Sequence, residues 1–255
     1  MKVALIQSSI VWENPSLNRI YFEEKINSIT ENIDLIVFPE MFSTGFTMNP
    51  KEVFETMDGE TIQWLQSTAK AKNSAITGSL IIKENSNFYN RLVFVFPSGD
   101  IKYYDKRHLF TLAGEEKVYT AGKERLIVEY LGWNICPLIC YDLRFPVFSR
   151  NTENYDLLIY VANWPKLRIN AWNALLKARA IENLAYTIGV NRIGVDNNNL
   201  EYNGHSQVID YLGNYIIENQ ENEGIFITIL HKSNLLEFRN KFGFLNDKDT
   251  FMVLN

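Results

Sequence analysis

Hydrophobic and polar positions follow two different periods along the chain. The short apolar runs 2–7 (KVALIQ) and 34–39 (DLIVFP) are typical of buried strands, and the segment 16–32 between them repeats apolar residues at helical spacing. This order predicts a β-α-β unit, with Ser16 as the cap of the helix. The apolar residues that carry the helical spacing are Leu17, Ile20, Tyr21, Ile26 and Ile29.

The two patterns continue through most of the chain. Helical spacing returns over 60–73 and 171–187, and hairpins are predicted at 90–106, around Pro-Ser-Gly-Asp, and at 125–140, around Leu-Gly. Further strands are predicted at 74–82, 155–163, 187–195, 205–219 and 224–230. Strands mixed with both helices and hairpins indicate an α/β fold in which helices cover a mixed sheet.

Two segments depart from these patterns. Pro137 lies inside a predicted strand, where it removes a ladder hydrogen bond, so we expect it at a bulge or on an edge. The tail, residues 232–255, sets four Phe on a polar background and is expected to pack on the domain surface or on a partner subunit.

The chain shows no repeat, low-complexity tract or linker, which predicts a single domain over residues 1–255.

Composition narrows the class of protein. The 255 residues carry a net charge of −5, which provides no electrostatic footprint for nucleic acid. No apolar run approaches the roughly 20 residues that span a bilayer. The apolar start of the chain breaks at Gln7, so we interpret it as a strand and not as a signal peptide. We therefore expect a cytoplasmic protein without a membrane or nucleic-acid partner.

The two cysteines, Cys136 and Cys140, are expected to be free thiols. An extended backbone separates them by more than about 10 Å, whereas a disulfide needs Cα atoms closer than about 7 Å. Together with three scattered histidines they do not make a zinc site. No metal and no other cofactor is predicted.

Three predicted strands end in side chains that can react. Glu40 follows the second apolar run, Lys106 closes the first hairpin and Cys140 closes the second. Each has an ordinary structural explanation: a cap or surface group for the glutamate, a solvated cation for the lysine and a buried thiol for the cysteine. Their joint occurrence at strand ends indicates a site, because catalytic groups are commonly held by short loops on a rigid sheet.

Glutamate, lysine and cysteine together suffice for acyl transfer from an amide. A thiol with a pKa of about 8.5 is a weak nucleophile at neutral pH unless a neighbouring group activates it. A carboxylate can take its proton as general base and later protonate the leaving amine. An ammonium group can stabilise both the thiolate and the oxyanion. The combination predicts covalent amide hydrolysis that needs neither histidine nor metal.

The segments FPEMFSTGF, YDKRHLF and ICYDLRFP closely resemble the nitrilase, or carbon–nitrogen hydrolase, superfamily. ANWP and LLKARAIENLAY follow in register, and the resemblance extends from the first predicted strand to GHSQVIDYLG. It implies a four-layer α-β-β-α sandwich with mixed sheets, paired with a second copy in a homodimer. It also implies a small-molecule amide substrate.

The resemblance assigns roles to the residues of these motifs. Glu40 would be the general base and Cys140 the nucleophile. Lys106 and the backbone N–H of Tyr141 would stabilise the oxyanion. Each role is an expectation carried over from the matching position of the family's motif.

Many members also have a second glutamate in the loop after the lysine. The stretch GEEKVYTAG supplies two candidates, and the family's spacing to an aromatic residue and a glycine selects Glu115. Glu116 would then face elsewhere. The alternative is a solvated acidic loop.

Among the branches of the superfamily, the chain looks most like the omega-amidases, which deamidate 2-oxoglutaramate and 2-oxosuccinamate. The bacterial type carries KRHLF, CYDLRFP, ANWP and a C-terminal motif in which this chain has Gly243 in place of the usual proline. Two alternatives remain. One is another branch, an N-carbamoyl amino acid hydrolase or a nitrilase; the other is a non-catalytic dimeric metabolite-binding protein.

Several aromatic and charged residues are candidates for substrate binding. In omega-amidases the arginine at the position of Arg144 is thought to receive the substrate carboxylate, and a planar guanidinium suits that role. The alternative is a salt bridge with Asp142 or with a partner chain. Trp164 is expected to line the pocket or to pack in the core, and Phe46 and Tyr141 are further candidates for the pocket wall.

A different mechanism would use a histidine. His108 lies two residues after Lys106, so on an extended backbone the two share a face, and a papain-like Cys140–His108 dyad is conceivable. The chain lacks the papain signature around the cysteine, which argues against this dyad.

Overall fold

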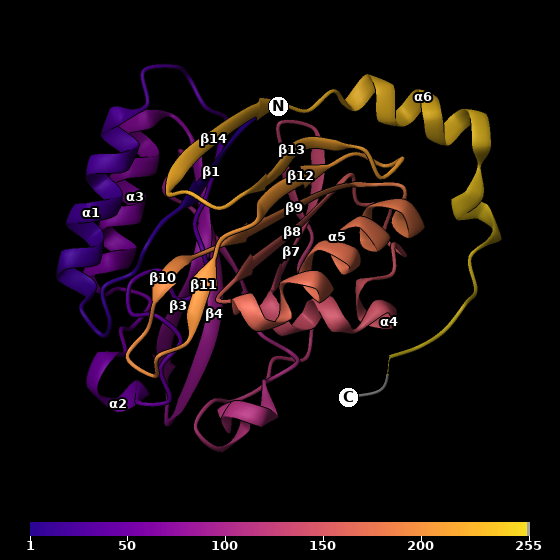
Figure 1. Ribbon diagram of the computed structural model, residues 1–255. Helices are drawn as coiled ribbons and strands as arrows, with labels where there is room; N and C mark the ends of the chain where they lie inside the picture. Colours follow the sequence, from indigo (N-terminus) through magenta and orange to yellow (C-terminus); the bar gives the residue numbers. More distant parts are fainter. Residues whose placement is uncertain (254–255) are drawn as a thin grey trace.

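Two six-stranded mixed sheets form the centre of the molecule, in a computed structural model that describes residues 1–253 (Figure 1). The strands of the first sheet are β1 (Lys2–Gln7), β2 (Leu35–Val37), β3 (Ala75–Glu84), β4 (Asn87–Val95), β5 (Ile101–Asp105) and β14 (Gly224–Ile229). Those of the second are β6 (Val128–Tyr130), β7 (Trp133–Ile139), β8 (Leu157–Ala162), β9 (Tyr186–Asn191), β12 (Ser206–Ile209) and β13 (Tyr215–Gln220). Their spatial orders are β14-β1-β2-β3-β4-β5 and β13-β12-β9-β8-β7-β6.

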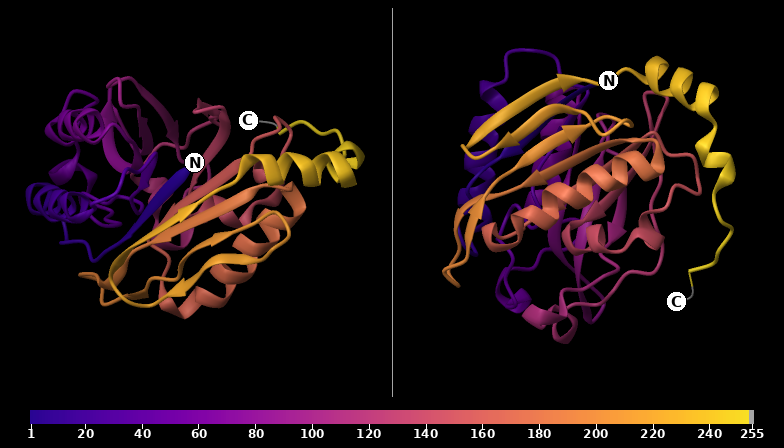
Figure 2. Two further views of the ribbon diagram at one scale, coloured as in Figure 1. Left: turned by 90° about the horizontal axis from the view of Figure 1, so that it is seen from above. Right: turned by 45° about the vertical axis from the view of Figure 1, so that its right-hand side comes forward.

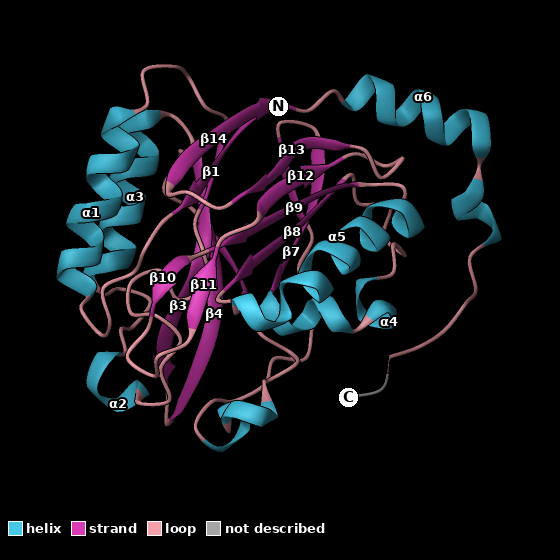
Figure 3. Cartoon of the chain, viewed as in Figure 1, coloured by secondary structure: helices cyan, strands magenta, loops and turns pink. Residues whose placement is uncertain are grey.

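Helices cover the outer faces of the sheets, so the layers follow the predicted order α-β-β-α (Figure 2, Figure 3). Helices α1 (Pro15–Ser28) and α3 (Glu60–Lys72) lie on the first sheet, and α5 (Ile169–Asn183) lies on the second. The shorter elements are α2 (Pro50–Val53), α4 (Pro146–Ser149), α6 (Lys232–Phe242), the strand pair β10 (Ile193–Val195) and β11 (Glu201–Asn203), and the 3-10 helices η1 (Thr111–Ala113), η2 (Glu115–Lys117), η3 (Cys140–Arg144), η4 (Lys166–Arg168) and η5 (Phe244–Asp247).

Strand β1 shows how the sequence supplies both interior layers. Val3 and Leu5 belong to the core between the two sheets, whereas Ala4 and Ile6 belong to the core under α1 and α3. All four side chains are fully buried. Because successive side chains of a strand point to opposite faces, a sheet covered on both faces needs apolar residues at every position.

Helix α1 turns a different face inward than its apolar spacing predicts. Its N-cap is Asn14, whose side chain accepts a hydrogen bond from the N–H of Leu17, so the prediction of Ser16 as the cap is wrong. Leu17 and Ile20 are 50% and 54% exposed. Asn18 occupies the inner face in their place, because its amide nitrogen donates to two backbone carbonyls.

Both predicted hairpins are present, β4–β5 and β6–β7. The second turns at Leu131 and Gly132, whose φ angles of 49° and 73° are both positive, as the tightest hairpin turns require. Pro137 pairs with Ile159 of β8 and lies beyond the end of β6, so β7 is locally an edge there. Of the two expectations for this proline, the edge is therefore the correct one.

The predicted helix over 171–187 begins and ends earlier in the structure. Helix α5 starts at Ile169 and stops at Asn183, because Leu184 adopts a left-handed conformation with φ of 43°. The predicted strand 187–195 is likewise divided between β9 and β10. No helix of the described residues, 1–253, combines the length and the apolar character that crossing a bilayer requires.

The C-terminal segment begins with α6, which packs against the domain along one face. Leu235 is buried, and two cations of the helix pair with the carboxylate of Asp156 at 2.6 and 3.1 Å. Beyond this contact Phe242 and Phe244 are 42% and 54% exposed. The predicted tail also includes residues 254–255, which lie outside the described residues.

Candidate active site

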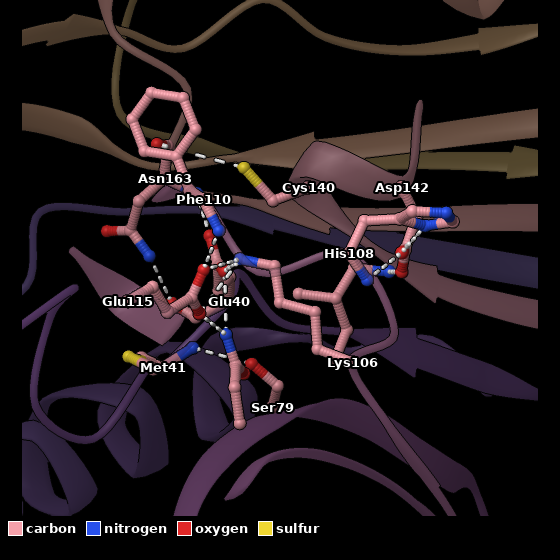
Figure 4. A network of polar contacts seen from close by, with 12 residues as sticks. Glu40, Met41, Ser79, Lys106, His108, Phe110, Glu115, Cys140, Asp142 and Asn163 are labelled. Carbon is pink, nitrogen blue, oxygen red and sulfur yellow. Dashed lines mark hydrogen bonds and ion pairs between the residues drawn. The ribbon is translucent and has the colours of Figure 1, made fainter. Parts of the chain in front are cut away.

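Side chains from both sheets meet where neighbouring strands end (Figure 4). Strand β2 leads into Glu40, β7 ends directly before Cys140, and β8 ends directly before Asn163. Lys106 follows β5, the edge strand of the first sheet. The sheet packing therefore makes neighbours of residues that are far apart in the chain.

Lys106 is buried between two glutamates, so its explanation as a solvated cation is wrong. Its Nζ lies 2.9 Å from Oε1 of Glu40 and 2.9 Å from Oε2 of Glu115. The side chains of Lys106, Glu40 and Glu115 are 1%, 0% and 0% exposed, so Glu40 is not a surface group and Glu115 is not in a solvated loop. Glu116 is exposed, as predicted.

Two asparagines that the sequence analysis did not single out complete the hydrogen bonding of the glutamates. Asn90 Nδ2 donates to Glu40 Oε1 at 2.8 Å and to Glu115 Oε1 at 3.3 Å. The backbone N–H of Asn163 donates to Glu40 Oε2 at 2.8 Å, and its Nδ2 donates to the Glu40 carbonyl at 2.6 Å. In the sequence, the ANWP motif could have pointed to Asn163 as a site residue. No motif pointed to Asn90, because it lies inside a hairpin strand.

The charges of this cluster shift the pKa values of its members. Burial alone lowers the pKa of Lys106, but the carboxylates of Glu115 and Glu40 outweigh it and raise that pKa above the ordinary value. Burial raises the pKa of Glu115, although the ammonium of Lys106 opposes this rise. Lys106 therefore stays charged throughout the neutral range, and Glu115 binds a proton more readily than a free glutamate.

Cys140 begins η3 in a backbone conformation that side-chain-bearing residues rarely adopt, with φ of 44°. Burial raises the pKa of its thiol well above the ordinary value, and the carboxylate of Glu40 raises it further. The resting thiol is therefore protonated at neutral pH. The N–H of Tyr141 lies in the first turn of η3, where backbone donors have no acceptor within the helix.

Cys136 differs from Cys140 in exposure, because Cys136 is fully buried whereas Cys140 is partly exposed. Cys136 lies inside β7, and burial raises its pKa to about 12. Both cysteines are free, as predicted.

The carboxylate of Asp142 fixes the turn that carries Cys140. It accepts hydrogen bonds from the N–H of Ile139 at 3.0 Å and from the hydroxyl of Tyr104 at 2.8 Å. His108 adds two contacts, its backbone N–H at 3.1 Å and its ring Nδ1 at 2.8 Å. The ring of His108 also stacks on Phe145. Among residues 1–253 no hydrogen bond joins this ring to Cys140, whose sulfur lies 4.0 Å from the carbonyl of Asn163, so the structure gives no support to a Cys140–His108 dyad.

A cavity of about 390 Å³ opens over the reactive groups, with Glu40, Lys106 and Cys140 in its wall. A mostly apolar cavity of this size with a few polar groups suits a small molecule. The pocket candidates from the sequence all line it: Phe46, Tyr141, Arg144 and Trp164. The lining residues that the sequence analysis missed are Met48, Phe110, Leu112, Ala113, Asn163, Pro165, Arg168, Asp196, Asn198, Leu200 and Tyr202.

Trp164 combines both of its expected roles, because it lines the cavity and packs against Trp172 with ring centroids 5.5 Å apart. The guanidinium of Arg144 lies 5.0 Å from the centre of the Trp164 ring. The carboxylate of Asp142 is bound elsewhere, so the alternative of an Arg144–Asp142 salt bridge is wrong. Arg144 is exposed at the mouth of the cavity.

The arrangement can perform proton transfer and nucleophilic attack at one wall of the cavity, because a carboxylate, an ammonium and a thiol meet there. Among residues 1–253, no group of three or more His, Cys, Asp or Glu side chains is placed to hold a metal ion.

Comparison with known proteins relates the chain to enzymes that act on carbon–nitrogen bonds. The family described as carbon-nitrogen hydrolase matches residues 2–239. The chain is 43% identical to omega-amidase YafV of Yersinia enterocolitica, over 100% of this chain and 99% of that protein. It is 33% identical to 2-oxoglutaramate amidase of Bacillus subtilis (strain 168), over 96% of each.

Solved structures give the same relationship. The crystal structure of XC1258 from Xanthomonas campestris, a CN-hydrolase superfamily protein with an arsenic adduct in the active site, matches with a TM-score of 0.97. The two sequences are 42% identical, and the match covers 99% of this chain and 98% of the other. Saccharomyces cerevisiae Nit3, a member of the nitrilase superfamily, matches with a TM-score of 0.83 at 22% identity, which bears on the fold alone.

Proposed function

This chain belongs to the carbon–nitrogen hydrolase family, and from that membership we propose that it is an omega-amidase. As a member, it is an enzyme that hydrolyses the carbon–nitrogen bond of amides. Its substrates are small omega-amido-2-oxo acids, 2-oxoglutaramate and 2-oxosuccinamate, which give the dicarboxylate and ammonia. The activities named for its relatives support this substrate class.

The first half of the proposed reaction forms a thioester. The sulfur of Cys140 attacks the carbon of the terminal amide while Glu40 takes the thiol proton. A carbon–sulfur bond forms, and the negative charge that develops on the carbonyl oxygen is stabilised by Lys106 and the N–H of Tyr141. Glu40 then protonates the amide nitrogen, the carbon–nitrogen bond breaks and ammonia leaves.

The second half of the reaction releases the acid. Glu40 removes a proton from water, and the resulting hydroxide attacks the thioester carbon. The carbon–sulfur bond breaks, the thiolate of Cys140 recovers the proton from Glu40, and the dicarboxylate departs. Throughout, Glu115 holds the ammonium of Lys106 in place through its hydrogen bonds of 2.9 and 3.1 Å.

One observation carries the proposal: two members of the buried cluster of Glu40, Lys106 and Glu115, namely Glu40 and Lys106, line the same cavity as Cys140. Burying three charged groups together is unfavourable compared with an apolar core, so such a cluster has no advantage for stability alone. Its place in the wall of a cavity, with strongly perturbed pKa values, is typical of a catalytic site.

Ammonia release from 2-oxoglutaramate by the purified protein tests the proposal. The wild type is expected to turn over this substrate, and Cys140→Ala is expected to lose activity by several orders of magnitude, because removal of a covalent nucleophile disables the whole catalytic unit. Cys136→Ala is the matched control. It removes a thiol four residues earlier, inside β7, and should affect packing more than turnover.

The products distinguish the alternatives. Release of carbon dioxide with ammonia from an N-carbamoyl amino acid, or consumption of a nitrile, with no activity on 2-oxoglutaramate, would assign the protein to another branch. Binding of these compounds without turnover would indicate a metabolite-binding protein. Normal activity of Cys140→Ala would contradict the proposed nucleophile.

We further propose that residues 1–255 form one domain that works as a cytoplasmic homodimer without a cofactor. The match of one family to residues 2–239 supports the single domain. The segment 232–255, which contains α6, would contact the second copy. Support for this contact comes from its exposed apolar side chains, which are Leu236, Phe242, Phe244, Phe251, Met252 and Val253.

A further inference from the structure

The cavity carries two arginines that no carboxylate of the described residues neutralises. Arg144 and Arg168 are the last residues of η3 and η4, and both line the cavity. Each has an aromatic ring as its partner, and neither forms an ion pair with any carboxylate among residues 1–253. Arg91, by contrast, binds Asp105 through two nitrogens at 2.7 and 2.9 Å. Two unpaired cations at one cavity attract an anion.

Aromatic contacts hold both guanidinium groups at the cavity. Arg144 lies 5.0 Å from the ring centre of Trp164, and Arg168 lies 5.1 Å from that of Phe110. The indole N–H of Trp164 also donates to the backbone carbonyl of Arg168 at 2.9 Å, which links the two elements. Stacking on a ring leaves the N–H groups of a guanidinium available, and this group has donors but no acceptor.

The carboxylates in the cavity wall are already engaged. Glu40 is bound by Lys106. Asp196 Oδ1 accepts the backbone N–H groups of Asn198 at 2.8 Å and Leu200 at 3.0 Å, and its Oδ2 accepts the hydroxyl of Tyr202 at 2.8 Å. Both carboxylates therefore have few acceptor sites left for an ammonium group, which would also meet two guanidinium groups in the cavity.

We infer that Arg168 is a specificity-determining residue that, with Arg144, binds the 2-oxo carboxylate end of the substrate and disfavours the corresponding 2-amino acid amide. The inference rests on the proposed omega-amidase function and names the residues that select its substrate. A 2-oxo carboxylate presents only oxygen acceptors and a negative charge, which match two cations that offer only donors. Glutamine replaces the ketone with an ammonium, which those cations repel.

Arg168 should contribute more than Arg144 to the preference for the 2-oxo acid. It is partly buried, whereas Arg144 is exposed at the mouth of the cavity. Water competes less for a partly buried guanidinium and screens its charge less, so the same hydrogen bond contributes more to binding there.

The test replaces Arg168 with Met and, as a matched control, Lys166 with Met. Lys166 lies on the same 3-10 helix, is exposed and pairs with Glu201. For 2-oxoglutaramate, Arg168→Met should raise KM about 10- to 100-fold, the effect of losing a charge-assisted hydrogen bond, with a smaller change in kcat. The neutral amide pentanamide should be much less affected, and the preference for 2-oxoglutaramate over glutamine should fall. Lys166→Met should behave as the wild type, and Arg168→Lys should fall between wild type and Arg168→Met.

Calorimetric titration with 2-oxoglutarate tests the same inference without turnover. This compound carries the same 2-oxo carboxylate, so Arg168→Met should weaken its binding by a similar factor. If the wild type bound 2-oxoglutarate but hydrolysed no 2-oxoglutaramate, the proposed function would fail while the inference stood. Three results would overturn the inference about Arg168. The first is an unchanged KM and binding constant in Arg168→Met, and the second is a wild type that does not bind 2-oxoglutarate. The third is an equal loss of activity on 2-oxoglutaramate, pentanamide and glutamine together with a lowered Tm.

Discussion

At the scale of single residues, protonation decides how the cysteine acts. Many reactive cysteines are stabilised as thiolates by a neighbouring cation, but the thiol of Cys140 is buried beside the carboxylate of Glu40, and both effects raise its pKa. Lys106 opposes this rise without overcoming it. In the proposed mechanism, the thiolate is therefore generated only as Glu40 takes the thiol proton.

Alkylation measures this state of Cys140. Iodoacetamide should label it slowly at neutral pH and faster as the pH rises, because the thiolate reacts and its pKa lies above the usual value of about 8.5. Glu40→Gln removes a negative charge that raises this pKa. Labelling at neutral pH should therefore accelerate in this variant, while turnover falls at least ~100-fold with the loss of the proposed general base. Mass spectrometry measures the rate at which Cys140 is labelled in the wild type and in the variant. Labelling of Cys136 first, or slower labelling in Glu40→Gln, would contradict this account.

Replacement of Lys106 by Met should reduce stability as well as turnover. Without the ammonium, Glu40 and Glu115 remain buried together, and the pKa of Glu115, already raised by burial, rises further. A carboxyl with a raised folded-state pKa contributes stability below its unfolded pKa and loses that contribution as the pH rises through the folded value. The variant should therefore lose about 3 kcal/mol of unfolding free energy at neutral pH, and less in mild acid.

Urea unfolding at both pH values measures the effect of Lys106→Met on stability. Lys166→Met, on the protein surface, is the control and should change stability little at either pH. An equal loss at both pH values would contradict the expected titration of Glu115 in the variant.

At the scale of elements, the buried carboxylate of Asp142 connects β5 to β7. Its partners Tyr104 and His108 come from β5 and the segment after it, and Ile139 is the last residue of β7. These contacts hold the turn that begins at Cys140 against the strand that leads to Lys106. The two proposed oxyanion donors, Lys106 and the N–H at the start of η3, are therefore held at a fixed spacing.

Asp142→Asn should loosen this connection. The amide presents a nitrogen donor where the carboxylate accepted hydrogen bonds, so at least one buried donor loses its partner. We expect kcat to fall roughly 10- to 100-fold, the scale of a small misplacement of reacting groups, together with a lower Tm. Asp210→Asn is the control, since Asp210 accepts backbone N–H groups in the exposed β12–β13 turn. Unchanged kcat in Asp142→Asn would contradict the positioning role.

At the scale of the whole molecule, the site depends on how the two sheets pack. The first sheet supplies Glu40 and Lys106, and the second supplies Cys140 and Asn163. The hydrogen bond from Asn163 to Glu40 joins residues 123 positions apart in the chain. Any change that shifts one sheet against the other should therefore affect turnover before it unfolds the domain.

The proposed homodimer is tested by the mass in solution. Light scattering coupled to gel filtration should give about twice the chain mass of 29.6 kDa. The double change Phe242→Ser and Phe244→Ser removes two exposed aromatic residues of the C-terminal segment and should shift the population toward the monomer. Ile20→Ser is the control, because Ile20 is 54% exposed on α1, in the opposite outer layer. A monomeric wild type would contradict the proposal.

The sequence by itself determined the order of most strands and helices and the identity of the residues with reactive side chains. Strand and helix periodicity depends on near neighbours in the chain, so it can be recognised locally. Glu40, Lys106 and Cys140 stand at the ends of such runs, and their motifs carry the resemblance to the family. The α/β class followed from the local patterns, whereas the four-layer arrangement and Glu115 followed only from that resemblance.

Only the tertiary structure decided which residues meet. Asn90 lies 50 positions from Glu40 and inside a strand, so nothing in its local pattern indicates that it binds the glutamates. Arg168 follows an irregular segment, and its place at the cavity depends on the ring of Phe110, far away in the chain. The inner face of α1 carries Asn18 instead of Leu17, because the carbonyls that need its amide come from other segments. Burial and hydrogen bonding are settled between distant segments, and the order of residues along one segment does not specify its partner.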